Sequence, residues 1–191
     1  TMSVAQKLYE GVELEEGSTG LITYMRTDSV NVAVSAREEA SGYIRTKIGQ
    51  DYLPEKPRIY KTKSKSAQEA HEAIRPTSVE LTPAKVKAYL KPEQLKLYTL
   101  IFDRFVASQM TPAVYDQTTV EVTKDEYLLR ATGSILRFAG FLKAYREQTD
   151  EDDQGAKDEA DSERIRLPDV KEGDVVELSK VLAEQHFTQP P

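Results

Sequence analysis

The chain contains no cysteine, which excludes disulfide bonds and thiolate metal sites. It has only two histidines, His71 and His186, and their separation in the sequence argues against a histidine-based metal site. No apolar run approaches the length of a membrane span, and no basic-then-apolar segment opens the chain as an export signal would. We therefore expect a cytoplasmic protein with no membrane contact and no metal site of its own.

The charge of the chain is unevenly distributed. The net charge over 191 residues is −6, but residues 150–163 hold eight acidic side chains and one lysine, so the rest of the chain carries +1. Residues 58–66, RIYKTKSKS, hold four cations and no acid. Taken alone, such a run is more commonly a solvated loop. Because particular side chains make phosphate contacts, Lys61, Lys63 and Lys65 are also candidates for nucleic-acid binding.

The first hundred residues predict helices with recognisable start signals. Ser35 with Glu38 three residues on is typical of a capping box, and Thr82 followed by Pro83 is typical of a helix start. A longer apolar stripe follows Pro92, and its aromatic side chains predict a core rather than a ligand site. The expected helices cover residues 2–10, 35–48, 82–90 and a long segment from 92 onward.

The pattern changes beyond Pro112, where polar and β-branched residues alternate as in half-buried strands. We expect strands within residues 115–123, 127–133, 135–142 and 174–182. The fold class is thus α+β, with a helical domain over 1–108, a β-rich domain over 109–191 and a flexible acidic loop over 150–163. Neither end closes an element, so we expect a piece of something larger.

The stretch GLITYMRTDS, residues 20–29, joins a short apolar run to polar residues. On an extended segment residues two apart point to the same side, so Tyr24 and Arg26 could face one ligand. A phenol is a weak nucleophile, but it can attack a phosphodiester held in line when positive charge stabilises the reacting oxygens. Arginine matches two phosphate oxygens with its planar fork. The alternative is a core tyrosine beside a surface arginine.

A second candidate segment is SAQEAHEAIRPT, residues 66–77. If this segment is helical, His71 and Arg75 lie four residues apart on one face. His71 could donate to a phosphate oxygen or pass a proton near neutral pH. The alternative is a histidine on a helix surface with no ligand.

The two segments together resemble the type IA DNA topoisomerases, within them the bacterial topoisomerase I group. Residues 1–11, 94–116 and 184–191 resemble the same family, so the similarity covers nearly the whole chain and is weakest across the acidic loop. The resemblance implies an isomerase that uses no ATP. In it Tyr24 attacks single-stranded DNA, forms a 5′-phosphotyrosine link and releases a 3′-hydroxyl, and strand passage and religation then relax negative supercoils.

The resemblance also implies roles for individual residues. Arg26 matches the residue that holds the scissile phosphate, and His71 matches a histidine at the DNA-facing site. Arg75 is expected at the DNA one turn further along. Thr27 and Asp28 belong to the matching motif, and we expect them to shape the loop; for Asp28 an N-cap or a brace on Arg26 is favoured over substrate contact.

At the level of domains, the resemblance implies a winged-helix or CAP-like tyrosine domain followed by part of an antiparallel β arch or barrel. The intact enzymes also need Mg²⁺, held by a Toprim-type domain. The acid-rich residues 150–153 sit in a run with no rigid flanks, and we interpret them as solvated charge. The expected partners are single-stranded DNA and the remaining domains of the same enzyme, near the nucleoid, with no nucleotide cofactor. We expect this chain alone not to relax supercoiled DNA.

Three other interpretations were weighed. The chain could be a non-catalytic module that binds single-stranded DNA and acts as a gate or hinge. A sequence-specific winged-helix regulator would need a recognition helix with side chains aimed at base edges, and no convincing one is present. A tyrosine recombinase would need several separated arginines and histidines around its nucleophile, and that pattern is absent.

We predict weak, salt-sensitive binding to a single DNA strand, dominated by the candidate cations. Raising the salt concentration should weaken the affinity steeply, because binding to phosphates releases condensed counterions. Fluorescence anisotropy of a labelled oligonucleotide at several salt concentrations measures the slope. An affinity that does not change with salt would contradict an electrostatic contact. The cations that we expect to dominate are Arg26, Lys61, Lys63, Lys65 and Arg75.

Overall fold

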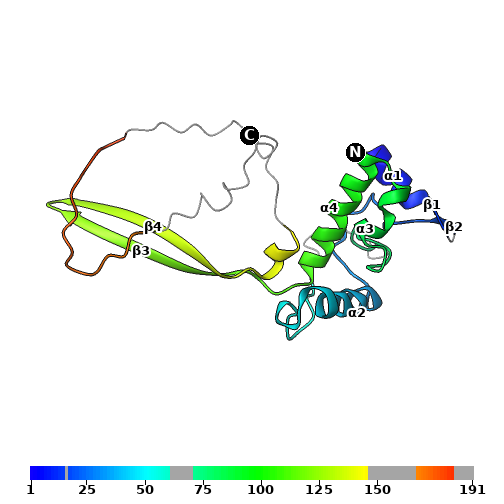
Figure 1. Cartoon of the computed structure of the whole chain (residues 1–191), viewed down its shortest axis with the longest axis horizontal. Coiled ribbons are helices and arrows are strands. Elements are labelled where there is room, and N and C mark those ends of the chain that lie inside the picture. Colours follow the sequence, from blue (N-terminus) through cyan, green and yellow to red (C-terminus); the bar gives the residue numbers. More distant parts are fainter. Residues whose placement is uncertain (16, 61–70, 146–166, 183–191) are drawn as a thin grey trace.

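A computed structural model describes residues 1–15, 17–60, 71–145 and 167–182. The described chain is α+β with antiparallel sheets, as predicted, and a helical unit is followed by a long two-stranded hairpin (Figure 1). Its elements are, in order, α1 (Met2–Glu10), β1 (Val12–Leu14), β2 (Gly17–Thr19), α2 (Val34–Tyr43), the π-helical η1 (Ile44–Ile48), the 3-10 helix η2 (Gln50–Tyr52), α3 (Pro83–Val86), the 3-10 helix η3 (Lys87–Tyr89), α4 (Pro92–Ser108), β3 (Val114–Lys124), β4 (Tyr127–Phe138) and the 3-10 helix η4 (Gly140–Lys143).

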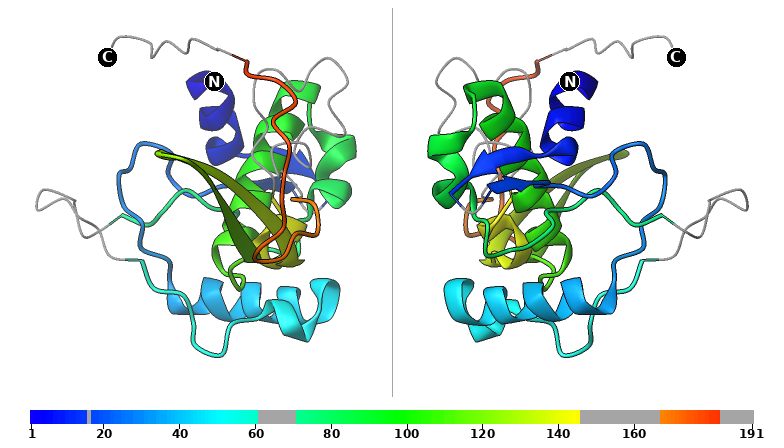
Figure 2. Two further views of the ribbon diagram at one scale, coloured as in Figure 1. Left: turned by 90° about the vertical axis from the view of Figure 1, so that its left-hand side faces the viewer. Right: turned by 90° about the vertical axis from the view of Figure 1, so that its right-hand side faces the viewer.

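Helix α4 is the centre of the hydrophobic core. It buries Tyr98, Phe102, Phe105 and Val106, and α1, α2 and α3 contribute apolar side chains to the same cluster. Its position between α1 and α2 is visible from two sides (Figure 2). The hydroxyl of Tyr98 donates to the carbonyl of Leu81 at 2.6 Å, and burial raises the pKa of the phenol. The expected aromatic stripe therefore serves packing.

The predicted helix starts are confirmed at three places and wrong at one. α1 begins at Met2, α4 begins at Pro92, and α3 begins at Pro83 with the Thr82 side chain as N-cap accepting from the Lys85 backbone N–H. α2 instead begins at Val34, with Ala33 as N-cap and no capping side chain, so Ser35 and Glu38 form no capping box. The buried side chains of α2 lie in the core, and this packing sets where the helix begins more strongly than a surface cap does.

Strands β3 and β4 form one antiparallel hairpin that extends away from the helical unit (Figure 1). A two-residue turn joins them, with Asp125 at a φ of 53°, a conformation that Asp tolerates better than most residues. Glu121 and Arg130 face each other across the strands and form an ion pair. The predicted strands at 127–133 and 135–142 are one continuous strand up to Phe138, followed by η4.

The root of the hairpin is fixed to the helical unit. The backbone N–H of Thr111 donates to the Tyr52 carbonyl at 3.0 Å, and the Thr111 carbonyl accepts from Phe141 at 2.9 Å. The ring of Tyr52 lies 4.9 Å from that of Phe138, and the Lys143 ammonium lies 4.3 Å from the Tyr52 ring centroid. The start of β3 and the end of β4 thus share one anchoring point at η2.

The strand expected at residues 174–182 is wrong. In this part of the chain the structure has a turn at Lys171–Asp174 and no strand, and Val175 is 93% exposed. The alternating pattern is present, but no neighbouring strand pairs with it among the described residues, so it forms no hydrogen-bonded ladder. The acidic residues 150–163 lie outside the described residues.

We predict that Tyr98→Phe lowers the free energy of unfolding by about 1–2 kcal/mol. The change removes the hydroxyl that satisfies the Leu81 carbonyl and leaves the packing of the ring intact. Denaturant unfolding measures the difference. Tyr127→Phe, in an exposed ring on the hairpin, should change stability by less than about 0.5 kcal/mol. Equal effects of the two changes would contradict a role for the buried hydrogen bond.

Candidate active site around Tyr24

Two segments far apart in the sequence, residues 20–31 and 71–77, lie against each other. Ile22 and Pro76 form an isolated antiparallel bridge, and Leu21 and Ile22 are buried in the core. The apolar start of the first segment is therefore an anchor for the polar residues that follow it.

Thr23 holds the two segments together. Its backbone N–H donates to the Arg75 carbonyl at 2.9 Å, and its hydroxyl donates to the Ala73 carbonyl at 2.7 Å while accepting from the Arg75 N–H at 2.9 Å. A further bond runs from the Thr77 N–H to the Leu21 carbonyl at 3.0 Å. Because their backbone groups are used in this pairing, residues 71–77 form no helix, so the helical arrangement considered for residues 66–77 does not apply to this part. Residues 66–70 lie outside the described residues.

The Tyr24 ring lies at the surface between two other rings. It is 38% exposed, and its centroid lies 5.4 Å from that of Tyr9 on α1 and 5.4 Å from that of His71. Both contacts are edge-to-face, with interplanar angles of 65° and 75°. The structure thus brings Tyr24 and His71 together across 47 residues of sequence and leaves the phenol accessible to solvent.

Arg26 is exposed two residues beyond Tyr24, and Met25 between them is buried. This alternation fits the expectation that the phenol and the guanidinium face the same side. Among the residues that the structure describes, no carboxylate lies within ion-pair distance of Arg26. Its charge is therefore available to a ligand.

The following residues shape the loop. The hydroxyl of Thr27 accepts from the Ser29 N–H at 3.0 Å, and the hydroxyl of Ser29 accepts from the Asn31 N–H at 3.2 Å. Asp28 is exposed and makes no hydrogen bond or ion pair within the described ranges, so it neither caps a helix nor braces Arg26 here. A loop-shaping role thus has support for Thr27 and lacks it for Asp28.

Arg75 differs from Arg26 in its surroundings. Its side chain is 12% exposed and pairs with Glu72 at 2.5 Å, and it also donates to the Pro76 carbonyl at 2.9 Å. These contacts occupy the guanidinium and favour a role in holding the 71–77 segment. A contact of Arg75 with DNA stays a prediction. Lys61, Lys63 and Lys65 lie outside the described residues.

Tyr9 is the residue that the sequence reading missed. Its position in an amphipathic helix suggested packing, and only the tertiary fold brings its ring against Tyr24. No pattern in the sequence distinguishes such a neighbour from an ordinary helix residue. The sequence likewise gives no sign of the structural role of Thr23, because its hydrogen-bond partners lie about 50 residues away.

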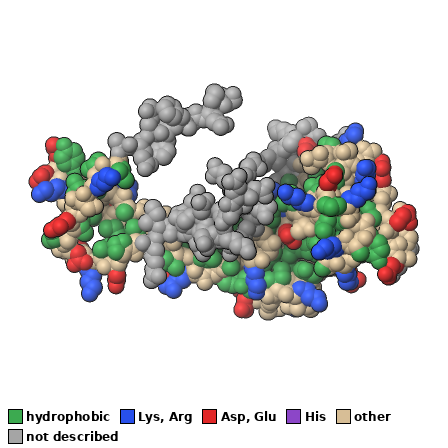
Figure 3. Space-filling model, turned by 45° about the horizontal axis from the view of Figure 1, so that its top comes forward, with side chains coloured by type: hydrophobic (Ala, Val, Ile, Leu, Met, Phe, Trp, Pro, Cys, Tyr) green, Lys and Arg blue, Asp and Glu red, His purple; other side chains and the backbone are tan. Residues whose placement is uncertain are grey.

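The described part of the chain has neither a metal-ligand cluster nor a membrane-spanning helix. No three His, Asp or Glu side chains gather there in an arrangement that could hold a metal ion. No helix there is both long and apolar enough to span a bilayer. On the face drawn in Figure 3, cationic and anionic side chains are interspersed over the helical unit rather than collected in one basic region. Any contact with phosphate therefore depends on local groups of arginine and lysine.

Comparison with known proteins decides the family. A family model described as DNA topoisomerase matches residues 1–191. This chain belongs to the DNA topoisomerase family. The type IA resemblance seen in the two motifs is thereby confirmed.

Relatives and solved structures of this topoisomerase family agree. The chain is 51% identical over its whole length to DNA topoisomerase 1 of Xylella fastidiosa, of which it covers 23%, and 49% identical to that of Helicobacter pylori, of which it covers 24%. A structure of full-length topoisomerase I from Thermotoga maritima matches 78% of the chain and 23% of its own length, at 39% identity and a TM-score of 0.65. The chain thus spans about a quarter of the length of these relatives.

We predict that Thr23→Val loosens the pairing around Tyr24. Valine keeps the approximate shape but can neither accept from the Arg75 N–H nor donate to Ala73. Stability should fall by about 1–3 kcal/mol, because two partly buried backbone groups lose a partner. Hydrogen exchange should show the Arg75 amide exchanging about tenfold faster or more. Thr46→Val removes an exposed hydroxyl that donates to Gly42, and it should leave the Arg75 amide unchanged. Equal protection of that amide in both variants would contradict the assignment.

Proposed function

We propose that this chain supplies the nucleophile for transient cleavage of single-stranded DNA in a type IA topoisomerase. The observation that carries the proposal is the position of Tyr24: its ring is exposed and packed edge-on against His71, in the stretch GLITYMRTDS that it shares with Arg26 and that resembles the family motif. Sequence alone left a core tyrosine as the alternative. The exposure of the ring favours the catalytic interpretation.

In the proposed reaction the Tyr24 hydroxyl oxygen attacks a backbone phosphorus. The bond from phosphorus to the 3′ oxygen breaks, so the 5′-phosphate becomes linked to tyrosine and the other end leaves as a 3′-hydroxyl, which takes up a proton. The reverse attack reseals the strand, and no nucleotide cofactor is needed because the phosphotyrosine conserves the bond energy. Two ends held apart in this way allow strand passage and the relaxation of negative supercoils.

The residues around the phenol have distinct proposed roles. The guanidinium of Arg26, which has no carboxylate partner among the described residues, would hold the scissile phosphate and stabilise charge on its oxygens. His71, in ring contact with Tyr24, would donate to a phosphate oxygen or pass a proton. Thr27 and Thr23 would position the loop. Phosphate contacts by Arg75, Asp28, Lys61, Lys63 and Lys65 remain proposals.

The whole enzyme would complete what this quarter-length piece lacks. We place Mg²⁺, single-strand guidance and the Toprim-type domain in the remaining parts of the intact enzyme, as the family resemblance implies. The helical unit would correspond to the winged-helix or CAP-like tyrosine domain. The β3–β4 hairpin would correspond to part of the arch.

A second candidate function is a gate or hinge module that binds DNA without chemistry of its own. The anchoring of the hairpin root at η2 favours it, because one small joint connects the long hairpin to the helical unit. The two functions are compatible in an intact enzyme, and they differ in whether Tyr24 is required.

The experiment mixes the chain with the metal-binding part of a relative, Mg²⁺ and a DNA strand labelled at either end. Denaturing gels should show the 3′ label migrating with this chain and the 5′ label on a shorter free strand. Tyr24→Phe should abolish both products, because the attacking oxygen is gone.

Tyr9→Phe is the matched control. It removes a neighbouring hydroxyl and keeps the ring that contacts Tyr24, so the adduct should persist. An adduct that survives in Tyr24→Phe would overturn the assignment of the nucleophile. An adduct that is absent from the unchanged chain, while single-stranded DNA still binds, would favour the hinge module.

A further inference from the structure

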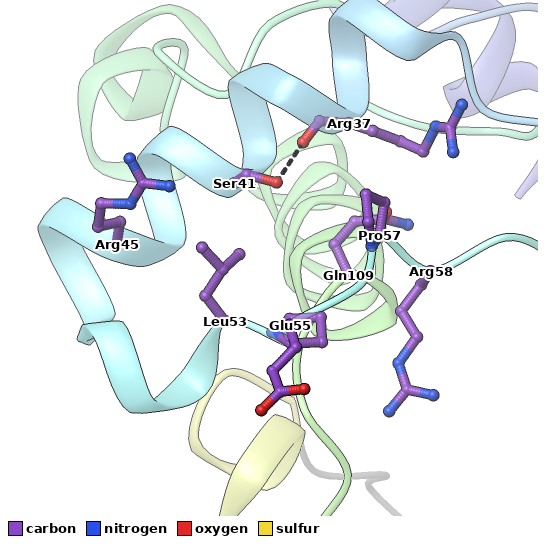
Figure 4. A pocket seen from close by; sticks show the side chains of 9 residues that line it. Arg37, Ser41, Arg45, Leu53, Glu55, Pro57, Arg58 and Gln109 are labelled. Carbon is purple, nitrogen blue, oxygen red and sulfur yellow. Dashed lines mark hydrogen bonds between the residues drawn. The ribbon is translucent and has the colours of Figure 1, made fainter.

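A groove separate from Tyr24 lies between α2 with η1 and the extended residues 53–58. Arg37, Ser41 and Arg45 line one wall at intervals of four residues, which places them on one side of the helix. The opposite wall includes Glu55 and Arg58 (Figure 4). Three arginines from two chain segments thus border the groove, and their guanidinium groups point in different directions from its rim (Figure 4).

One of these arginines has an unmet hydrogen bond. The Nε of Arg37 is buried and has no partner within the described residues. A buried charged donor without an acceptor is costly, and an arginine usually meets that need with a carboxylate or a phosphate. The hydroxyl of Ser41 does not meet it, because it donates to the Arg37 carbonyl at 2.8 Å. An anion bound beside the Arg37 side chain, at the rim of the groove, would supply the missing acceptor.

The charge of the groove is positive and uncompensated. The residues that line the groove include three arginines and one acid, Glu55, so their formal net charge is +2. In the described ranges none of the three forms an ion pair. Arg75, Arg130 and Arg137, by contrast, each pair with a carboxylate. Within the described ranges Arg26 and Arg104 likewise form no ion pair, so the groove arginines differ from these two in bordering a common cavity.

The walls of the groove are held in place. Pro54 and Pro57 fix the backbone on either side of Glu55. Beyond them the Tyr60 hydroxyl donates to the Ser108 carbonyl at 2.6 Å, which ties the segment to the end of α4. Gln109, the next residue, is only 4% exposed and lines the groove. A preformed site loses little conformational entropy when it binds.

We propose that this groove binds the sugar–phosphate backbone of a single nucleic-acid strand, as a second contact surface away from the phenol. Arg37 and Arg45 are eight residues apart, about 12 Å along a helix, so one small anion does not span both, whereas successive phosphates do. α2 lies on the opposite side of α4 from α1, the helix that contacts Tyr24 (Figure 2). The choice of nucleic acid rests on the proposed function.

The test measures binding of a labelled, unstructured DNA oligonucleotide to the 191-residue chain and to a variant with Arg37, Arg45 and Arg58 all changed to Gln. The affinity at low salt should fall about tenfold or more. The slope of log affinity against log salt should decrease by about 2, because about 0.7 is lost for each phosphate contact to a single strand. An unchanged slope would overturn the proposal.

The matched control changes three exposed lysines elsewhere to Gln and removes the same total charge. A comparable loss of affinity in this control would show that net charge alone weakens binding, and it would overturn the proposal that the groove binds the strand. Circular dichroism melting checks that both variants remain folded. The control lysines, on α3, η3 and α4, are Lys85, Lys87 and Lys96.

The absence of cysteine allows a direct test of position. Ser41→Cys should form a disulfide with a thiol-tethered oligonucleotide, and unmodified oligonucleotide should compete, whereas the exposed Thr123→Cys near the tip of the β3–β4 hairpin should react far less. Competition by inorganic phosphate alone, without crosslinking to DNA, would overturn the nucleic-acid assignment. If the Tyr24 adduct does not form but DNA crosslinks to Ser41→Cys, the proposed function fails and the groove proposal is retained. If the adduct forms but no crosslink does, only the groove proposal fails.

Discussion

The candidate site depends on one hydroxyl group. Thr23 uses its side chain both as donor and as acceptor toward residues 73 and 75, and its backbone adds a third bond. These bonds hold two loop segments in an extended pairing that neither would adopt alone. Without that pairing His71 would have no fixed position beside Tyr24, and the exposed phenol would lack a defined neighbour on that side.

The core explains why such a pairing lies at the surface and still stays ordered. Leu21 and Ile22 are buried beside Leu8, while Tyr24 is exposed. The apolar start of the 20–31 segment is therefore buried in the helical unit, and the polar residues that follow it are exposed. Burial of an apolar side chain contributes about 1.5–3 kcal/mol, so two of them stabilise this anchor substantially.

Local signals predicted local structure well and long-range structure poorly. Thr82 with Pro83, and the alternating residues of β3 and β4, act within a few positions, and the structure agrees with them. The proposed capping box at Ser35 failed because packing of α2 set the helix start. The helical arrangement considered for residues 66–77 does not form at 71–77, because partners some 50 residues away use the backbone there.

The site shows the same division. The motif resemblance indicated Tyr24, Arg26 and His71, but not how they are held. The contribution of Tyr9, the ion pair of Arg75 with Glu72 and the unpartnered Arg37 depend on tertiary contacts and have no local signature. The pattern at 174–182 is a strand signal that lacks a neighbour to pair with among the described residues.

The hairpin has a consequence for handling the chain. In the described residues β3 and β4 pair only with each other, so each presents one outer edge of backbone donors and acceptors. Leu128, Leu129 and Ile135 add exposed apolar side chains along β4. Uncovered edges of this kind act as templates for further strands. Concentrated solutions of the chain will therefore tend toward edge-to-edge self-association, which dilution or a capping strand peptide would reverse.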